Sequence, residues 1–139
     1  MRTITKTAVL ASITAAAGAV GMTLSAPSAQ AAPQICPALP GQSSTMADCS
    51  ASSGPTGLTL AITDNGGSAA ATGDNYSGPA AIAVGPGASV TMTGVKPGLA
   101  IGIAGPGATV VVDGQNGPTC TGGLAFAGDF QTLQGCVSQ

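Results

Sequence analysis

A repeat of about twenty residues, marked by glycine-rich turns, is the feature of this sequence that most constrains its fold. The turns at residues 65–67, 85–87 and 105–107 read Asn-Gly-Gly, Gly-Pro-Gly and Gly-Pro-Gly, and they are twenty residues apart. Short runs with alternating side chains stand before and after the turns, and frequent glycine disfavours helix. The sequence therefore predicts an all-β protein built from repeated strand–turn–strand units.

Two architectures fit these units. In a β-solenoid, each unit of about twenty residues is one turn of the coil, and equivalent strands stack in parallel. In an antiparallel meander or sandwich, each glycine turn instead joins two neighbouring strands as a hairpin. We favour a small glycine-rich solenoid because the register of the turns persists across three units, and because small inward residues suit a narrow interior.

The alternation in each strand predicts the side that faces the core. The strands after the second and third turns have one apolar face, which we expect to point inward: Ala88, Val90, Met92, Ala108, Val110 and Val112. The run at residues 58–63 alternates in the same way. There we expect Leu58, Leu60 and Ile62 to be the inward set.

Thr91 and Thr93 lie on the hydroxyl-bearing face of their strand. They resemble one rung of the threonine ladders of ice-binding solenoids. At a spacing of twenty residues the preceding positions hold Ala71 and Gly73, so the sequence predicts no such array.

The first thirty-one residues have the features of a secretory signal peptide. A start with two basic residues precedes an uncharged apolar stretch at residues 8–24, and Ala29 and Ala31 supply the small residues of a cleavage site. We expect a helix in this segment, cleavage after Ala31, and a mature protein that is secreted or held at the cell wall. The alternative is a membrane anchor, but a stretch of about 17 residues is at the lower limit for a span. After cleavage we expect no membrane span.

Removal of the signal leaves an acidic chain with a single cation. Residues 32–139 contain five Asp, no Glu, and Lys96 as the only basic residue, so the net charge is −4. We expect no nucleic-acid partner, because phosphate binding needs clustered Lys and Arg. Within this part, residues 32–57 are rich in Pro and Ser and are predicted to form an irregular entry segment. Residues 58–139 are predicted to form the β-repeat domain.

Four cysteines follow the signal segment, which is an even number in a chain predicted to reach an oxidising compartment. Cys36, Cys49, Cys120 and Cys136 allow three disulfide connectivities. We favour Cys36–Cys49 and Cys120–Cys136, which close short loops at the two ends of the chain. A zinc site is the alternative, but the sequence has no C-x-x-C motif and no His.

Two resemblances add to this interpretation. Residues 71–77 (Ala-Thr-Gly-Asp-Asn-Tyr-Ser) and 81–88 (Ala-Ile-Ala-Val-Gly-Pro-Gly-Ala) resemble the repeats in the β-roll heads of trimeric bacterial adhesins, which implies a solenoid. By its export signal, its Ala, Gly and Pro bias and its four Cys, the whole chain resembles small secreted actinobacterial proteins of unknown function. Neither resemblance implies a site residue.

The sequence offers few residues for catalysis. Nucleophilic catalysis needs a base, but there is no His, and Lys96 lies in a Gly-Val-Lys-Pro-Gly turn. Asp64, Asp74, Asp113 and Asp129 occupy different positions of the repeat, so they do not form the facing pair that glycoside hydrolysis needs. We therefore expect no enzyme, no catalytic residue and no cofactor.

The best candidates for a metal are the Asp and Asn residues of two turns. Asp64, Asn65, Asp74 and Asn75 offer oxygens for calcium, but their spacing departs from the G-G-x-G-x-D-x-U-x calcium repeat. Turn formation by these residues is the favoured interpretation. We expect a non-catalytic structural or interaction protein of the cell envelope or extracellular space, with an unidentified partner. The alternative is a secreted module that binds calcium or a small ligand.

Overall fold

The computed structural model describes residues 32–139, and the predicted signal peptide at residues 1–31 lies outside the described residues. The described part contains twelve strands and no helix, hence no helix that could cross a membrane. The strands are β1 (Gln34–Ala38), β2 (Ser43–Thr45), β3 (Cys49–Ser53), β4 (Thr59–Asp64), β5 (Ser68–Gly73), β6 (Ser77–Val84), β7 (Ser89–Gly94), β8 (Gly98–Ala104), β9 (Thr109–Val112), β10 (Thr119–Thr121), β11 (Ala125–Asp129) and β12 (Gln134–Ser138).

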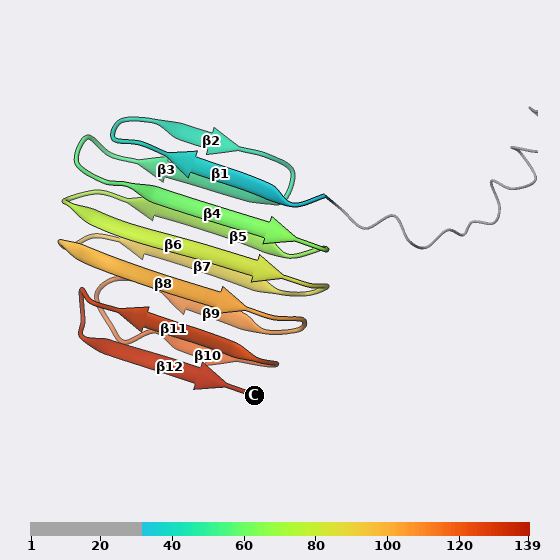
Figure 1. Ribbon diagram of the computed structural model, residues 1–139. Coiled ribbons are helices and arrows are strands. Elements are labelled where there is room, and N and C mark those ends of the chain that lie inside the picture. The colour runs from blue at the N-terminus through green and yellow to red at the C-terminus, as the bar shows by residue number, and fades with distance from the viewer. Residues whose placement is uncertain (1–31) are drawn as a thin grey trace, which may run out of the picture. The chain divides into compact units, whose positions relative to one another are not determined.

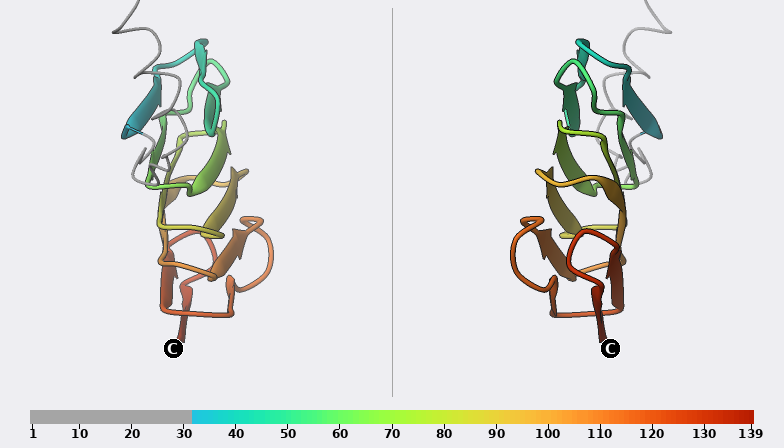
Figure 2. Two further views of the ribbon diagram at one scale, coloured as in Figure 1. Left: turned by 90° about the vertical axis from the view of Figure 1, so that its right-hand side faces the viewer. Right: turned by 90° about the vertical axis from the view of Figure 1, so that its left-hand side faces the viewer.

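The strands form two six-stranded sheets that face each other, as the views along the strands in Figure 2 show. The first sheet has the order β1-β4-β6-β8-β11-β12 and the second has the order β10-β9-β7-β5-β3-β2. In the middle of each sheet the strands are parallel, because the chain alternates between the sheets from β3 to β9 (Figure 1). This is a β-solenoid of about three turns, which confirms the predicted all-β solenoid; the meander and the sandwich are wrong.

The register between successive turns of the solenoid is not constant. Leu60 lies beside Ala80, an offset of 20 residues, whereas Ala70 lies beside Thr91, an offset of 21. The turn at 85–88 is one residue longer than the turn at 65–67, which accounts for the change. The residue beside Thr93 is therefore Thr72. The column assignment made from a constant spacing of twenty residues was wrong for β5.

Antiparallel strands close both ends of the solenoid. At the start β1 pairs with β4 and β2 with β3; at the end β10 pairs with β9 and β11 with β8. The prediction of an irregular segment at residues 32–57 was wrong, because β1, β2 and β3 lie there. Its Ser- and Ala-rich runs carry little hydrophobic periodicity, and they become strands by pairing with the first turn of the solenoid.

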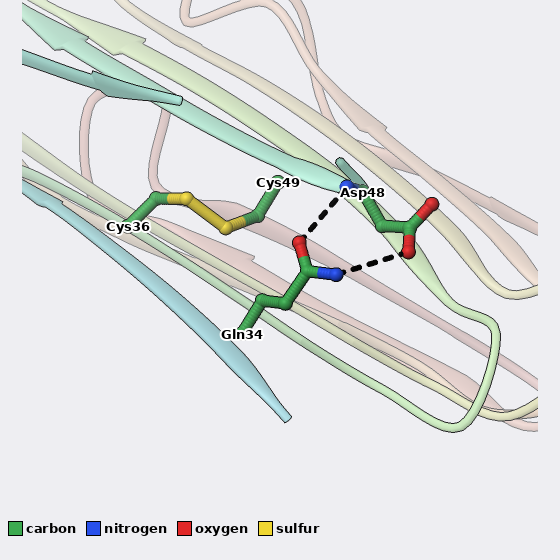
Figure 3. Close-up of a disulfide and its surroundings, with 4 residues drawn as sticks. All are labelled: Gln34, Cys36, Asp48 and Cys49. Carbon is green, nitrogen blue, oxygen red and sulfur yellow. Dashed lines mark hydrogen bonds between the residues drawn. A yellow bond between two sulfur atoms is a disulfide. The ribbon is translucent and has the colours of Figure 1, made fainter. Parts of the chain in front are cut away.

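Two disulfides join the sheets at the two ends of the solenoid. Cys36 of β1 binds Cys49 of β3 with 6.1 Å between their Cα atoms (Figure 3), and Cys120 of β10 binds Cys136 of β12 with 5.7 Å. This is the pairing that the sequence favours. Beside the first disulfide, the Gln34 Nε2 donates to Asp48 Oδ2 at 3.2 Å, and the backbone N–H of Asp48 donates to Gln34 Oε1 at 2.9 Å (Figure 3).

The interior between the sheets is narrow and is filled mainly by alanine. Its largest side chains come from the second sheet, where the predicted inward set is indeed buried: Ala88, Val90, Met92, Ala108, Val110 and Val112. The first sheet contributes small residues opposite them. Gly102 is the clearest case, because a methyl group there would lie 3.0 Å from Cγ1 of both Val90 and Val110.

The inward side of β4 is opposite to the prediction. Its buried residues are Thr59, Ala61 and Thr63, whereas Leu58 is exposed and Leu60 and Ile62 are half-buried on the outer side. The narrow interior accounts for this, because it has room for Ala and Thr but not for a column of Leu and Ile. The buried hydroxyl of Thr59 has a polar partner, because its Oγ1 lies 3.2 Å from the Oγ of Ser53.

Candidate functional site

The outer face of the first sheet is apolar across all six strands. Register pairs align one outward residue per strand in a continuous line, here named the isoleucine row: Ile35, Ile62, Ile82, Ile103, Phe126 and Val137. Ile103 is 38% exposed and Phe126 is 47% exposed, although both are large apolar side chains within strands. Residues that would normally form a core therefore face outward.

Two further rows complete this face. The central row consists of Pro37, Leu60, Ala80, Ile101, Gly128 and Gly135. Beyond it, Gly78 lies beside Leu99, and the backbone N–H of Phe130 donates to the carbonyl of Leu99; this leucine row consists of Leu58, Gly78, Leu99 and Phe130. The central row has small residues at half of its positions. At Ala80, Gly128 and Gly135 it therefore leaves space beside the isoleucine row, whereas Leu60 and Ile101 fill it on β4 and β8.

Two shallow hollows open on this face. One has a volume of about 370 Å³ and is lined by apolar residues that include Ile103, Leu124, Phe126 and Val137. The other has a volume of about 310 Å³ and lies where Gly78 and Ala80 leave space beside Leu99 and Phe130. We name the three rows together with these hollows the apolar face.

The charge on the apolar face is confined to one edge. Among the strands of the first sheet only Asp64 and Asp129 are charged. Asp129 points inward and is buried, and Asp64 is the last residue of β4, at the margin of the face. The surface can therefore be covered by a partner without burial of a formal charge.

The outer face of the second sheet is different, because most of its outward residues carry a hydroxyl group. The register aligns Thr72 with Thr93, and Ser89 with both Ser68 and Thr109. Ala70 and Val111 interrupt this pattern. The outward hydroxyl residues are Ser43, Thr45, Ser50, Ser52, Ser68, Thr72, Ser89, Thr91, Thr93, Thr109, Thr119 and Thr121.

The four calcium candidates lie in two turns that the fold keeps apart. Asp64 ends β4 and Asn65 follows it, whereas Asp74 and Asn75 follow β5, which runs back in the opposite direction to the other end of the strands. Asp74 Oδ1 accepts from the backbone N–H of Asn75 at 2.8 Å and from Thr56 Oγ1 at 3.2 Å. Both Asn residues have positive φ, which Asn tolerates in tight turns. Each pair thus has a turn-forming function, and within residues 32–139 no three His, Cys, Asp or Glu side chains form a metal cluster.

The remaining two candidate carboxylates are also engaged by their own turns. Asp113 accepts from the side chain of Asn116 and from the backbone N–H groups of Asn116 and Gln115, and these hydrogen bonds lower its pKa from 3.8 to about 2. Asp129 is buried and accepts from the backbone N–H of Gln131 at 2.8 Å and from Thr132 Oγ1 at 3.0 Å. The structure pairs neither of them with another carboxylate.

The apolar face is the feature that reasoning from the sequence missed. A usable signal was present, since the small residues Ala61 and Ala81 fall in one column of the repeat while Ile62 and Ile82 fall in the next. A repeat position that holds a small residue in successive turns indicates the side that faces the narrow interior of a solenoid. The large residues beside it must then point outward.

Comparison with known proteins gives a family without an assigned activity. A family model described as a family of unknown function (DUF6764) matches residues 1–139. The chain belongs to this family. Searches among curated proteins and among solved structures gave no significant match. The resemblances to adhesin heads and to secreted actinobacterial proteins are not tested by these comparisons and stay predictions.

Proposed function

We propose that this chain is an exported, non-catalytic interaction protein of the cell envelope or the extracellular space, and that it acts by contact through the apolar face. The observation that carries the proposal is the isoleucine row. Six large apolar side chains stand in register on the outside of the sheet, one on each strand, with no charge among them.

The size of the apolar face supports a function in binding. Strands about 4.8 Å apart and outward residues about 6.7 Å apart give six strands and three rows an area of roughly 600 Å². Soluble monomers rarely leave larger contiguous apolar patches uncovered, and patches of this size are often functional. The contrast with the hydroxyl-bearing face of the second sheet indicates that only one side of the solenoid is used in this way.

Export is supported by the predicted signal peptide and by the disulfides. Disulfides persist in oxidising compartments, and both bonds here close the ends of the solenoid. A non-catalytic function is supported by the chemistry of the polar groups. The sequence has no His. The carboxylates of Asp48, Asp74, Asp113 and Asp129 all accept hydrogen bonds that hold local structure.

Expression in a secreting bacterial host tests both parts of the proposal. We expect the chain outside the cytoplasm, beginning at Ala32 and with both disulfides formed, as read by non-reducing mass spectrometry. In its native state it should migrate as a particle larger than the single chain. Ile103→Asp on the apolar face should reduce that particle size, whereas Thr91→Asp, at the middle of β7 on the opposite face, should not.

Two results would overturn the proposal. The first is an uncleaved, reduced chain that stays in the cytoplasm. The second is the same native particle size for the wild type, Ile103→Asp and Thr91→Asp. Because both substitutions place an Asp at an outward position of a central strand, a loss of folding caused by the new charge would affect both variants.

A further inference from the structure

We infer that the occupant of the apolar face is a second copy of this chain, so that two solenoids pack with their first sheets face to face. This inference rests on the proposed function, in which the apolar face is the contact surface, and it names the partner. The hydroxyl-bearing faces of the second sheets would then form both exposed sides of the dimer.

The area of the face matches what a stable dimer needs. Two faces of roughly 600 Å² each bury roughly 1,200 Å² in total, which is the lower end of specific protein interfaces. Crystal-type chance contacts are smaller and less apolar. Continuity matters as well, because the isoleucine row crosses every strand of the sheet without a polar side chain.

The shape of the face is complementary to itself on β6, β11 and β12, where the isoleucine row stands beside alanine or glycine. Consider a two-fold axis that runs across the strands, between the isoleucine row and the central row. This axis places each residue of the isoleucine row over a residue of the partner copy's central row. The two residues come from the same strand and are two positions apart in sequence. Ile82 then lies over the partner's Ala80, and Phe126 lies over the partner's Gly128. On β4 and β8 the same axis places Ile62 over the partner's Leu60 and Ile103 over the partner's Ile101, so large apolar side chains meet there.

The same axis matches large with small residues elsewhere on the face. Val137 lies over the partner's Gly135, and on β8 Leu99 lies over the partner's Gly105. A two-fold interface repeats every such contact reciprocally, so each match occurs twice. Face-to-face sheets in proteins pack about 10 Å apart by interdigitation of this kind.

Charge favours a second copy over a lipid surface. Proteins that lie on membranes combine an apolar face with Lys and Arg for the headgroups and with Trp or Tyr at the interface. Residues 32–139 have Lys96 as their one basic residue, a net charge of −4 and no Trp. An anionic membrane surface would repel this chain. In the dimer Asp64 lies at the margin of the contact, opposite the partner's Leu58.

The ends of the solenoid favour a closed dimer over a longer assembly. Antiparallel strands and disulfides terminate both sheets. The edge strands β1, β2, β10 and β12 have only three to five residues, which limits end-to-end pairing of further copies. Packing through the apolar faces is reciprocal about a two-fold axis and closes the assembly at two.

Sedimentation equilibrium of the exported, disulfide-bonded chain tests the inference. We expect a mass of two chains at concentrations of about 1–100 µM, and a dissociation constant that falls as salt is raised, because the contact is apolar and the copies are acidic. Ile103→Asp should weaken the dimer by at least about tenfold. Thr91→Asp should leave it unchanged, which controls for a new carboxylate in the solenoid.

Gly128→Val is a sharper variant than Ile103→Asp, because it changes the shape of the apolar face and introduces no charge. In a single copy the Cβ of the new side chain would make only ordinary contacts, no closer than 3.7 Å to Phe126 and 3.9 Å to Ile101, and both of these side chains lie on the open outer face. In the dimer it would occupy the place of the partner's Phe126. We expect Gly128→Val to weaken the dimer by at least about tenfold while the melting temperature of the monomer holds or rises.

Each contrary result has a defined meaning. A monomeric wild type, or a dimer that Gly128→Val does not weaken, overturns the second copy as the occupant. Binding of a monomeric wild type to phosphatidylcholine vesicles overturns it in favour of lipid, and Gly128→Val should then bind at least as well. In both cases the proposed function stands if the exported particle still shrinks with Ile103→Asp, so the two failures are distinguishable.

Discussion

Replacing Met92 by alanine should empty the centre of the solenoid. Met92 is 1% exposed and is the largest of the fully buried side chains. Opposite it, on the first sheet, stands Gly102: a methyl group added there would lie 3.2 Å from Met92 Sδ. The two positions therefore share one space, and the stability of a variant at either should depend on the other.

The magnitude follows from the burial. A buried Met→Ala substitution costs about 2–5 kcal/mol, and paired strands on both sides of the cavity leave little freedom to collapse into it. For a domain of this size each kcal/mol lowers the melting temperature by about 4–8 °C. We therefore expect Met92→Ala to lower it by about 8 °C or more.

The complementary substitution at Gly102 overfills the same space. Gly102→Ala places its methyl group 3.0 Å from Cγ1 of Val90 and of Val110. Such overpacking destabilises the folded state by about 1–3 kcal/mol. Alanine also has less conformational freedom than glycine in the unfolded chain, and this offsets up to about 1 kcal/mol of the cost. In the Met92→Ala background the methyl group enters vacated space. The coupling in the double variant should therefore be favourable by about 0.5–3 kcal/mol.

The assay is thermal and guanidinium unfolding followed by far-ultraviolet circular dichroism, with both disulfides intact in every variant. Thr91→Ala, next to Met92 but exposed on the outer face, is the matched control and should change stability little. The reasoning fails if Met92→Ala costs less than about 1 kcal/mol. It also fails if Gly102→Ala has the same effect in both backgrounds, because the two sheets would then not meet at this point.

Three further outcomes are expected. A Cys36→Ser/Cys49→Ser double variant should lose about 3 kcal/mol, measured as the free energy of unfolding, because the disulfide closes a loop of 13 residues. Asp113 has its pKa lowered from 3.8 to about 2, so it stabilises the fold above pH 3.8 and this contribution is lost as the pH falls through 2. Acid unfolding of Asp113→Asn should accordingly show a shallower pH dependence over that interval, and an unchanged profile would contradict the assignment. Gln131→Leu removes the carbonyl that accepts both backbone N–H groups of residues 95–96 at 2.8 and 2.9 Å. It should cost about 1–2 kcal/mol in thermal unfolding, while Gln131→Glu, which keeps an acceptor, should cost less.

The inward sides of the second sheet were predictable because only one side of each strand is apolar. In β7, Val90 and Met92 alternate with Thr91 and Thr93, so burial of the apolar side is the only favourable choice. The first sheet offers no such contrast. In β6, Ala81 and Ala83 alternate with Ile82 and Val84, and both sides are apolar.

The length of one turn also limited how well the strand register could be predicted from the sequence. A constant repeat of twenty residues places Ala71 beside Thr91, but the register puts Ala70 there. A shift of one residue moves a side chain to the other face of the sheet. A single extra residue in one turn thus decides which side chains form columns on the outer surface, and the hydroxyl columns become visible only with the strand pairing.

Local properties of the chain were enough for several conclusions: the glycine turns and their spacing imply a repeated β unit, short loops bring Cys36 to Cys49 and Cys120 to Cys136, and the Asp and Asn residues form turns. The direction in which Leu60, Ile62 and Ile82 point was not among them. It is set by the distance between the two sheets, because a gap already filled by Val90, Met92 and Val110 has room only for small residues, mainly alanine, glycine and threonine, on the opposite side. Large apolar residues on that sheet must then face outward, and the surface proposed here to hold a partner exists for that reason.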